Sequence, residues 1–246
     1  MGRQVLAGHR SDPSLTPTND RGQAPTVRAR LVPHGWCLTP DVRGWGDGAG
    51  RIAGVAVTID LAGRVAVVTG GARGVGRGIT DRLRAAGATV AVVGRNRPDD
   101  LPDGVGFHAA DVRDADTATP LVEAVLAEHG RLDLLVNNAG GSPSVAAAEA
   151  SPQFSSRVVE LNLLSALHLA TAARAALADV GGSVVNITSL SGMRPSPGTA
   201  AYGAAKAGLI NLTRTLAMEW APEVRVNAVS AGMVRTELFD DYYGGP

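Results

Sequence analysis

The sequence predicts an α/β domain built on a doubly wound parallel sheet, and we place this domain at residues 59–246. From Arg64 onward, short β-branched apolar runs alternate with stretches of helical periodicity, which is the pattern of repeated strand–helix–strand units. The runs are continuously apolar, as expected for strands covered on both faces. The chain has 246 residues, 45% hydrophobic and 19% charged, so one globular domain with a full core is expected.

The expected elements follow in order along the chain. Six strands are expected, at residues 65–69, 89–93, 106–110, 132–137, 183–188 and 225–230. Helices are expected between them, at residues 75–86, 120–129, 152–178 and 201–219. Ser151-Pro152 and Thr119-Pro120 each read as an N-cap followed by a first-turn proline.

Residues 1–58 are predicted to be a disordered or irregular extension. They are rich in Gly, Pro and Arg and show neither helical nor alternating periodicity, so little apolar surface is available to offset their ordering entropy. A misassigned start site and a targeting arm are the alternatives. A weak strand-like run at residues 55–59 closes this segment.

Composition argues against several classes of partner. The formal net charge is zero, so neither a nucleic acid nor a membrane surface is an expected partner. The least polar long stretch, residues 161–180, is interrupted by polar residues and is expected to be a buried amphipathic helix. The single cysteine, Cys37, excludes an intrachain disulfide, and a cytoplasmic location is the expectation. No metal site is predicted.

A glycine-rich turn follows the first strand. Thr69-Gly70-Gly71-Ala72-Arg73-Gly74-Val75-Gly76 leads directly into a helix, where free amide groups favour a pyrophosphate. The spacing of Gly70, Gly74 and Gly76 differs from the common G-x-G-x-x-G fingerprint. A turn of this kind can also serve packing alone.

The end of the second strand bears on the choice of coenzyme. Sites that prefer NAD place an acid there for the ribose 2′-hydroxyl, whereas an arginine accommodates the 2′-phosphate of NADP. The strand ends in Gly94-Arg95-Asn96, and Arg73 in the turn adds a second cation. NADP(H) is therefore favoured over NAD(H), with solvated surface charges as the alternative.

Tyr202 and Lys206 lie four residues apart in an expected helix, so both side chains project from one face. A phenol is a poor base at neutral pH because its pKa is about 10, and a nearby ammonium favours the phenolate. Lys206 is the only lysine among 23 basic residues. We therefore expect Tyr202 to be a general acid/base that Lys206 activates.

These features together resemble the short-chain dehydrogenase/reductase family over residues 59–236, with its Thr-Gly-x-x-x-Gly-x-Gly turn and Tyr-x-x-x-Lys pair. The resemblance implies a Rossmann-like fold and assigns Ser189 to the substrate oxygen, with Ser191 as the competing candidate, and Asn162 to a proton-relay water. It also implies a homodimer or homotetramer. The coenzyme contacts that it implies are Gly70, Arg73, Gly74, Val75, Gly76, Arg95, Asp111, Val112, Asn138, Ala139, Gly140, Tyr202, Lys206, Val234 and Thr236.

The chain departs from the family pattern near its end. Ser230-Ala231-Gly232 lacks the proline of the family's Pro-Gly pair, and the chain stops at Pro246. A C-terminally truncated member is therefore expected, without a seventh strand, so that the sixth strand is an exposed edge. The alternative is that residues 55–59 replace the missing strand.

The predicted function is hydride transfer between NADP(H) and a small alcohol or ketone, with catalytic residues Asn162, Ser189, Tyr202 and Lys206. The alternative is a non-catalytic nucleotide-binding module that lacks a substrate lid.

Overall fold

The structure, a computed structural model, describes residues 59–237 and contains the predicted parallel sheet. Six strands lie in the order β3-β2-β1-β4-β5-β6, and every neighbouring pair is parallel. The predictions for residues 1–58 lie outside the described residues. The strands are β1 (Val65–Thr69), β2 (Thr89–Gly94), β3 (Gly106–Ala109), β4 (Leu134–Asn137), β5 (Ser183–Ser189) and β6 (Arg225–Ala231).

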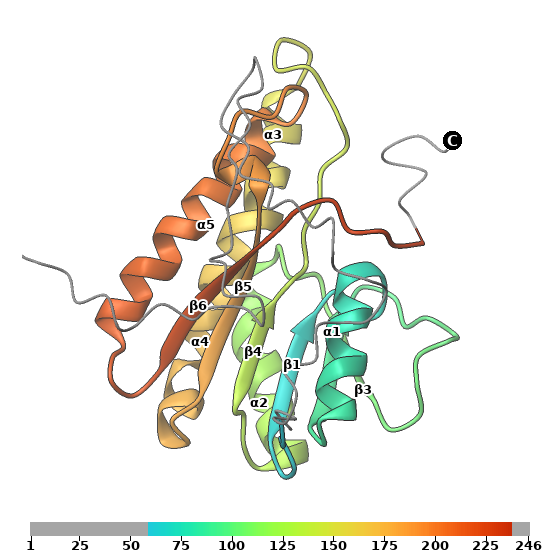
Figure 1. Cartoon of the computed structure of the whole chain (residues 1–246), viewed down its shortest axis with the longest axis vertical. Helices are drawn as coiled ribbons and strands as arrows, with labels where there is room; N and C mark the ends of the chain where they lie inside the picture. The colour runs from blue at the N-terminus through green and yellow to red at the C-terminus, as the bar shows by residue number, and fades with distance from the viewer. Residues whose placement is uncertain (1–58, 238–246) are drawn as a thin grey trace, which may run out of the picture. The chain divides into compact units, whose positions relative to one another are not determined.

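Helices cover both faces of the sheet, as Figure 1 shows. Alternate residues of β1 pack to opposite sides, with Val65 and Val67 in the core cluster with α2, α4 and α5, and Ala66 and Val68 in the cluster with α1. The sheet is therefore doubly wound, as predicted. The helices are α1 (Gly74–Ala85), α2 (Ala118–His129), α3 (Pro152–Val159), α4 (Ser165–Asp179) and α5 (Ala200–Glu219), with short turns η2 (Ala115–Thr117), η3 (Glu160–Leu164) and η4 (Leu190–Gly192).

Two helix predictions were wrong in detail. The helix expected at residues 152–178 is divided by a π-helical turn, η3. A π turn adds less than one residue to the helical period, so the apolar pattern of the sequence gives no sign of it. The helix expected from Pro120 begins at Ala118 instead, since η2 already turns the chain and Asp114 accepts a hydrogen bond from the Asp116 amide. The other proline cap is confirmed, since Ser151 Oγ accepts from the Phe154 amide at 3.1 Å.

The stretch Pro152–Asp179, which contains α3, η3 and α4, is long and apolar enough by composition to cross a membrane. Its inner side carries core residues instead, including Leu169, Ala173 and Leu177, each at most 2% exposed. Burial against the sheet accounts for its apolar character.

Within the described residues, β6 is an edge strand that pairs only with β5. Val226 near its start is buried, whereas Val229 is 54% exposed. The expected exposed edge is therefore present in this part of the chain.

Candidate active site

The glycine-rich turn follows β1 and is held in place by the residues that follow β4. The amides of Asn138 and Ala139, which follow β4, donate to Thr69 Oγ1 at 3.0 and 2.9 Å. Asn138 Nδ2 donates to the carbonyl oxygens of Thr69 and Gly70 at 2.9 and 3.3 Å. Residues 137–140, Asn-Asn-Ala-Gly, therefore brace the turn from the end of β4.

Gly76 shows why this turn requires glycine. A Cβ atom at Gly76 would lie 2.1 Å from the Gly70 carbonyl oxygen and 2.5 Å from Asn138 Nδ2. The first turn of α1 thus packs directly on the glycine loop, and it presents Gly74 and Val75 at the helix start. Arg73 precedes the helix and is exposed.

Charged residues gather where β2 and β3 end. Arg95 follows β2 and is exposed, and Asp111 follows β3. Arg113 Nε donates to both carboxylate oxygens of Asp111, at 2.9 and 3.1 Å. This hydrogen bonding, with smaller contributions from the charges of Arg113 and Arg95, lowers the pKa of Asp111. The Val112 side chain is buried in the core.

Lys206 and Tyr202 meet as the spacing predicted. Lys206 Nζ lies 5.7 Å from the centroid of the Tyr202 ring and donates to the Ile187 carbonyl oxygen at 2.8 Å. The Lys206 residue is only 3% exposed, and this burial lowers the pKa of its ammonium to about 8. A buried cation thus lies against the phenol.

Asn162 lies in η3 and joins this cluster from a different helix. Its Nδ2 donates to the Gly141 and Val158 carbonyl oxygens, both at 2.9 Å, and its Oδ1 accepts from the Gly141 amide at 2.9 Å. A Cβ atom at Gly140 would lie 2.7 Å from Asn162 Oδ1 and 3.1 Å from Lys206 Nζ. The loop after β4, the π turn and Lys206 therefore meet at Gly140.

Ser189 ends β5, and the turn η4 that follows packs on α5. Ser189 Oγ accepts from the Ser191 amide at 3.2 Å. A Cβ atom at Gly203 would lie 2.9 Å from the Ser191 carbonyl oxygen, and one at Gly192 would lie 3.0 Å from Lys206 Cβ. This packing brings both candidate serines to the part of α5 that carries Tyr202 and Lys206.

The segment after β6 reaches the glycine turn. Thr236 Cγ2 lies 3.9 Å from the position of a Cβ atom at Gly74, and residues 234–237 border a hollow with α1. Val234 is 44% exposed. The structure therefore brings the predicted coenzyme residues from β1, β4 and β6 to the same edge of the sheet.

A set of buried polar residues beneath this edge was not among the predicted site residues. Asn137 Nδ2 donates to Asn186 Oδ1, and Asn186 Nδ2 donates to Thr213 Oγ1, both at 2.9 Å. Asn137 and Asn186 face each other in the β4–β5 register, so an asparagine at matching depth in two apolar strands was the available signal. This chain of hydrogen bonds ties β4 and β5 to α5.

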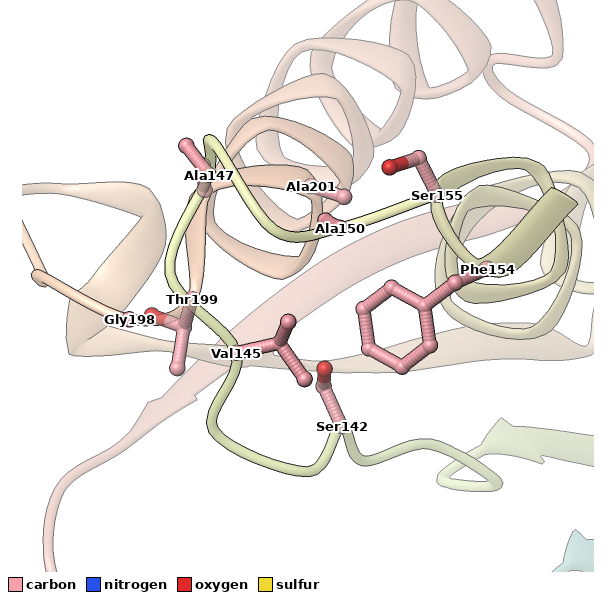
Figure 2. A pocket seen from close by; sticks show the side chains of 10 residues that line it. Ser142, Val145, Ala147, Ala150, Phe154, Ser155, Gly198, Thr199 and Ala201 are labelled. Atoms are coloured by element: carbon pink, nitrogen blue, oxygen red, sulfur yellow. The ribbon is translucent and has the colours of Figure 1, made fainter. Parts of the chain in front are cut away.

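A small pocket of about 60 Å³ lies outside the cluster formed by Asn162, Tyr202 and Lys206. Figure 2 shows the rings and methyl groups of Phe154 and Val145 facing it, with the Ser142 hydroxyl at its border. The loop after Gly140 supplies one wall, and Gly198–Ala201 supply another. The predicted catalytic residues do not line it.

Comparison with known proteins agrees with this geometry. The family model for short chain dehydrogenase matches residues 64–243. The chain is 35% identical to a 3-oxoacyl-(acyl-carrier-protein) reductase of Chlamydia muridarum, over 72% of this chain and 77% of the relative. It is 37% identical to the 4-formylbenzenesulfonate dehydrogenase of Comamonas testosteroni, over 74% and 77%.

A solved structure shows the same architecture. A short-chain dehydrogenase from Streptomyces avermitilis has a TM-score of 0.67 and 37% identity, and the match covers 72% of this chain and 68% of that one. The parallel sheet, the glycine turn and the sequence match agree. The chain is therefore an NAD(P)-dependent oxidoreductase of the short-chain dehydrogenase/reductase family.

Proposed function

We propose that this enzyme transfers hydride between NADP(H) and a small ketone or alcohol, with Tyr202 as the proton donor to the substrate oxygen. The observation that carries the proposal is the position of Lys206, the only lysine of the chain. It is buried against the Tyr202 ring and next to Gly140, where the loop after β4 meets α5. A buried ammonium is costly to fold around, and a catalytic role explains its presence there.

The residues at the sheet edge fit a dinucleotide. Gly76 packs closely on Gly70 because neither residue carries a side chain there, and the Gly74 amide already donates a hydrogen bond to a carboxylate. An anion is therefore a suitable ligand at this helix start. We assign the pyrophosphate to Gly70, Gly74, Val75 and Gly76, and the adenine end to Asp111 and Val112.

In the proposed mechanism, the substrate carbonyl oxygen accepts hydrogen bonds from Ser189 Oγ and the Tyr202 hydroxyl. The coenzyme supplies the hydride from its nicotinamide ring. Tyr202 then gives its proton to the oxygen as negative charge develops there. The Lys206 ammonium stabilises negative charge left on Tyr202, and Asn162 holds the 140–141 loop beside it. Oxidation of the alcohol follows the reverse order.

The proposed preference for NADP(H) rests on Arg95 and Arg73. Both side chains are exposed at the edge where the ribose would bind. Arg95 can offer a planar pair of donors to a phosphate, and no acid follows β2 before Asp99. A 2′-phosphate would therefore find a cation where NAD enzymes hold a carboxylate.

The proposed substrates are carbonyl compounds, in line with the 3-oxoacyl reductase among the relatives. The apolar pocket of Figure 2 is lined in part by Ala200 and Ala201, which directly precede Tyr202, and would take a small apolar substituent. We further propose a homodimer in the cytoplasm, with α4 and α5 at the interface. The outer face of α5 carries the small exposed residues Ala204, Ala207 and Asn211, which permit close helix packing.

The test is a thermal-shift titration of the full chain with NADPH and NADH, followed by turnover on a panel of ketones and 3-oxoacyl thioesters. We expect stabilisation by NADPH at lower concentrations than by NADH, and measurable NADPH oxidation with at least one carbonyl compound. Binding without turnover on any substrate would favour the non-catalytic module. Failure to bind either coenzyme would overturn the proposed function.

A further inference from the structure

The start of α1 lacks a cap from its own neighbourhood. Arg73, the residue before the helix, makes no side-chain cap, and the first turn carries no acidic residue. The first amides of a helix have no partner within the helix and carry partial positive charge. This end of α1 therefore attracts an anion from elsewhere.

Glu237, which is far from α1 in the sequence, supplies that anion. The Gly74 amide donates to Glu237 Oε1 at 2.6 Å, a contact between residues 163 positions apart. Figure 1 shows the chain crossing from the end of β6 towards α1. Residues 234–237 border a hollow of about 490 Å³ with the first turns of α1, and Glu237 is exposed at this hollow.

We propose that Glu237 occupies the place of the coenzyme pyrophosphate in the free enzyme and is displaced when the coenzyme binds. The inference rests on the proposed function, since it concerns the same coenzyme site. The Gly74 amide has one hydrogen to donate, and two anions at one helix start would repel each other. Glu237 is thus a residue that sets coenzyme affinity by competing for the same donor.

The proposed displacement would also couple the segment after β6 to coenzyme binding. Val234 and Thr236, which are predicted to contact the nicotinamide end, belong to the same short segment as Glu237. Release of the Glu237 carboxylate frees this segment to adjust to the bound molecule. One contact therefore links the pyrophosphate end of the site to its nicotinamide end.

The experiment compares NADPH affinity by titration calorimetry for the wild-type full chain and three variants. Glu237→Gln removes the charge, and we expect its dissociation constant to fall about 5- to 10-fold, because hydrogen bonds to charged acceptors are roughly twice as strong as neutral ones. Glu237→Asp keeps the charge on a shorter side chain that reaches the Gly74 amide less well. We expect its dissociation constant for NADPH also to fall below the wild-type value. Glu223→Gln, an exposed change in the turn before β6, should leave affinity unchanged.

A second readout does not need activity. Hydrogen exchange of the amides at residues 73–77 in the free protein should be faster in Glu237→Gln than in wild type, and the difference should vanish with NADPH bound. Unchanged affinity and unchanged exchange in Glu237→Gln, in a wild-type background that binds NADPH, would overturn this inference and leave the proposed function standing. A wild-type chain that binds neither coenzyme would remove both.

Discussion

At the scale of single residues, the site depends on a few side chains whose surroundings change their chemistry. Lys206 is a cation in an almost fully buried position, and its burial lowers the pKa to about 8. Its partners are the Ile187 carbonyl oxygen and the face of the Tyr202 ring. Burial of this charge costs stability, and the proposed catalytic role would explain why it is kept.

Lys206→Met should therefore raise the free energy of unfolding at pH 7 by about 1–3 kcal/mol while it removes turnover. The folded-state pKa of about 8 lies below the ordinary value of 10.5. The unfolded chain thus binds more protons, and wild-type stability rises as the pH rises from about 8 to 10.5. Urea unfolding at pH 7 and pH 10 should show the advantage of the variant shrinking at the higher pH. A variant less stable than wild type at pH 7 would contradict this view.

The proposed preference for NADPH over NADH can be tested at Arg95. Arg95→Asp replaces a cation by an acid at the end of β2, and the dissociation constant for NADPH should rise about 10-fold or more. NADH binding should change little or improve, because an acid suits a free 2′-hydroxyl. Arg225→Asp, an exposed change at the amino end of β6, is the control. Equal effects of Arg95→Asp on both coenzymes would remove the assignment.

At the scale of elements, the strands could be predicted within about two residues, because β-branched runs between helices identify buried strands directly. The segments that follow β1, β4 and β6 lie at one edge of the sheet, as the parallel arrangement led us to expect, whereas the roles of the predicted site residues stay predictions. Two features were out of reach. The π turn at Glu160–Leu164 adds less than one residue to the helical period. The Gly74–Glu237 contact depends on the path of an irregular segment, which periodicity does not describe.

Two glycines of α1 offer a matched test of this packing. Gly76→Ala should destabilise the domain by about 3 kcal/mol and weaken coenzyme binding, because the new Cβ would lie 2.1 Å from the Gly70 carbonyl oxygen. Gly78→Ala places the same methyl group where nothing but the neighbouring backbone of its own helix lies within 4 Å, and should stabilise the helix by about 0.5–1 kcal/mol. Thermal unfolding with and without NADPH measures both. Similar effects of the two changes would show that the glycine turn is not closely packed.

At the scale of the whole molecule, one sheet serves both as the core and as the frame of the site. The hydrogen bonds from Asn137 through Asn186 to Thr213 connect the middle of the sheet to α5. That helix carries Tyr202 and Lys206 on its inner side, and its outer side carries small exposed residues. Association through the outer face of α5 would therefore steady the catalytic residues on the inner face.

Ala207→Arg tests this association. Ala207 is exposed on α5, and a long charged side chain in a close helix contact should shift the protein from dimer to monomer in sedimentation velocity. Ala148→Arg, an exposed change in the loop before α3, should leave the dimer intact. A wild-type chain that sediments as a monomer would rule out the proposed interface.

The most direct measurement of the whole account is the turnover of Tyr202→Phe with NADPH and an accepted ketone, alongside its affinity for NADPH. The substitution removes only the hydroxyl and keeps the ring on which Lys206 packs. The account predicts a fall in turnover of about 10²- to 10⁴-fold with NADPH affinity close to wild type. Turnover near the wild-type rate, with the coenzyme bound, would show that the proton comes from another group.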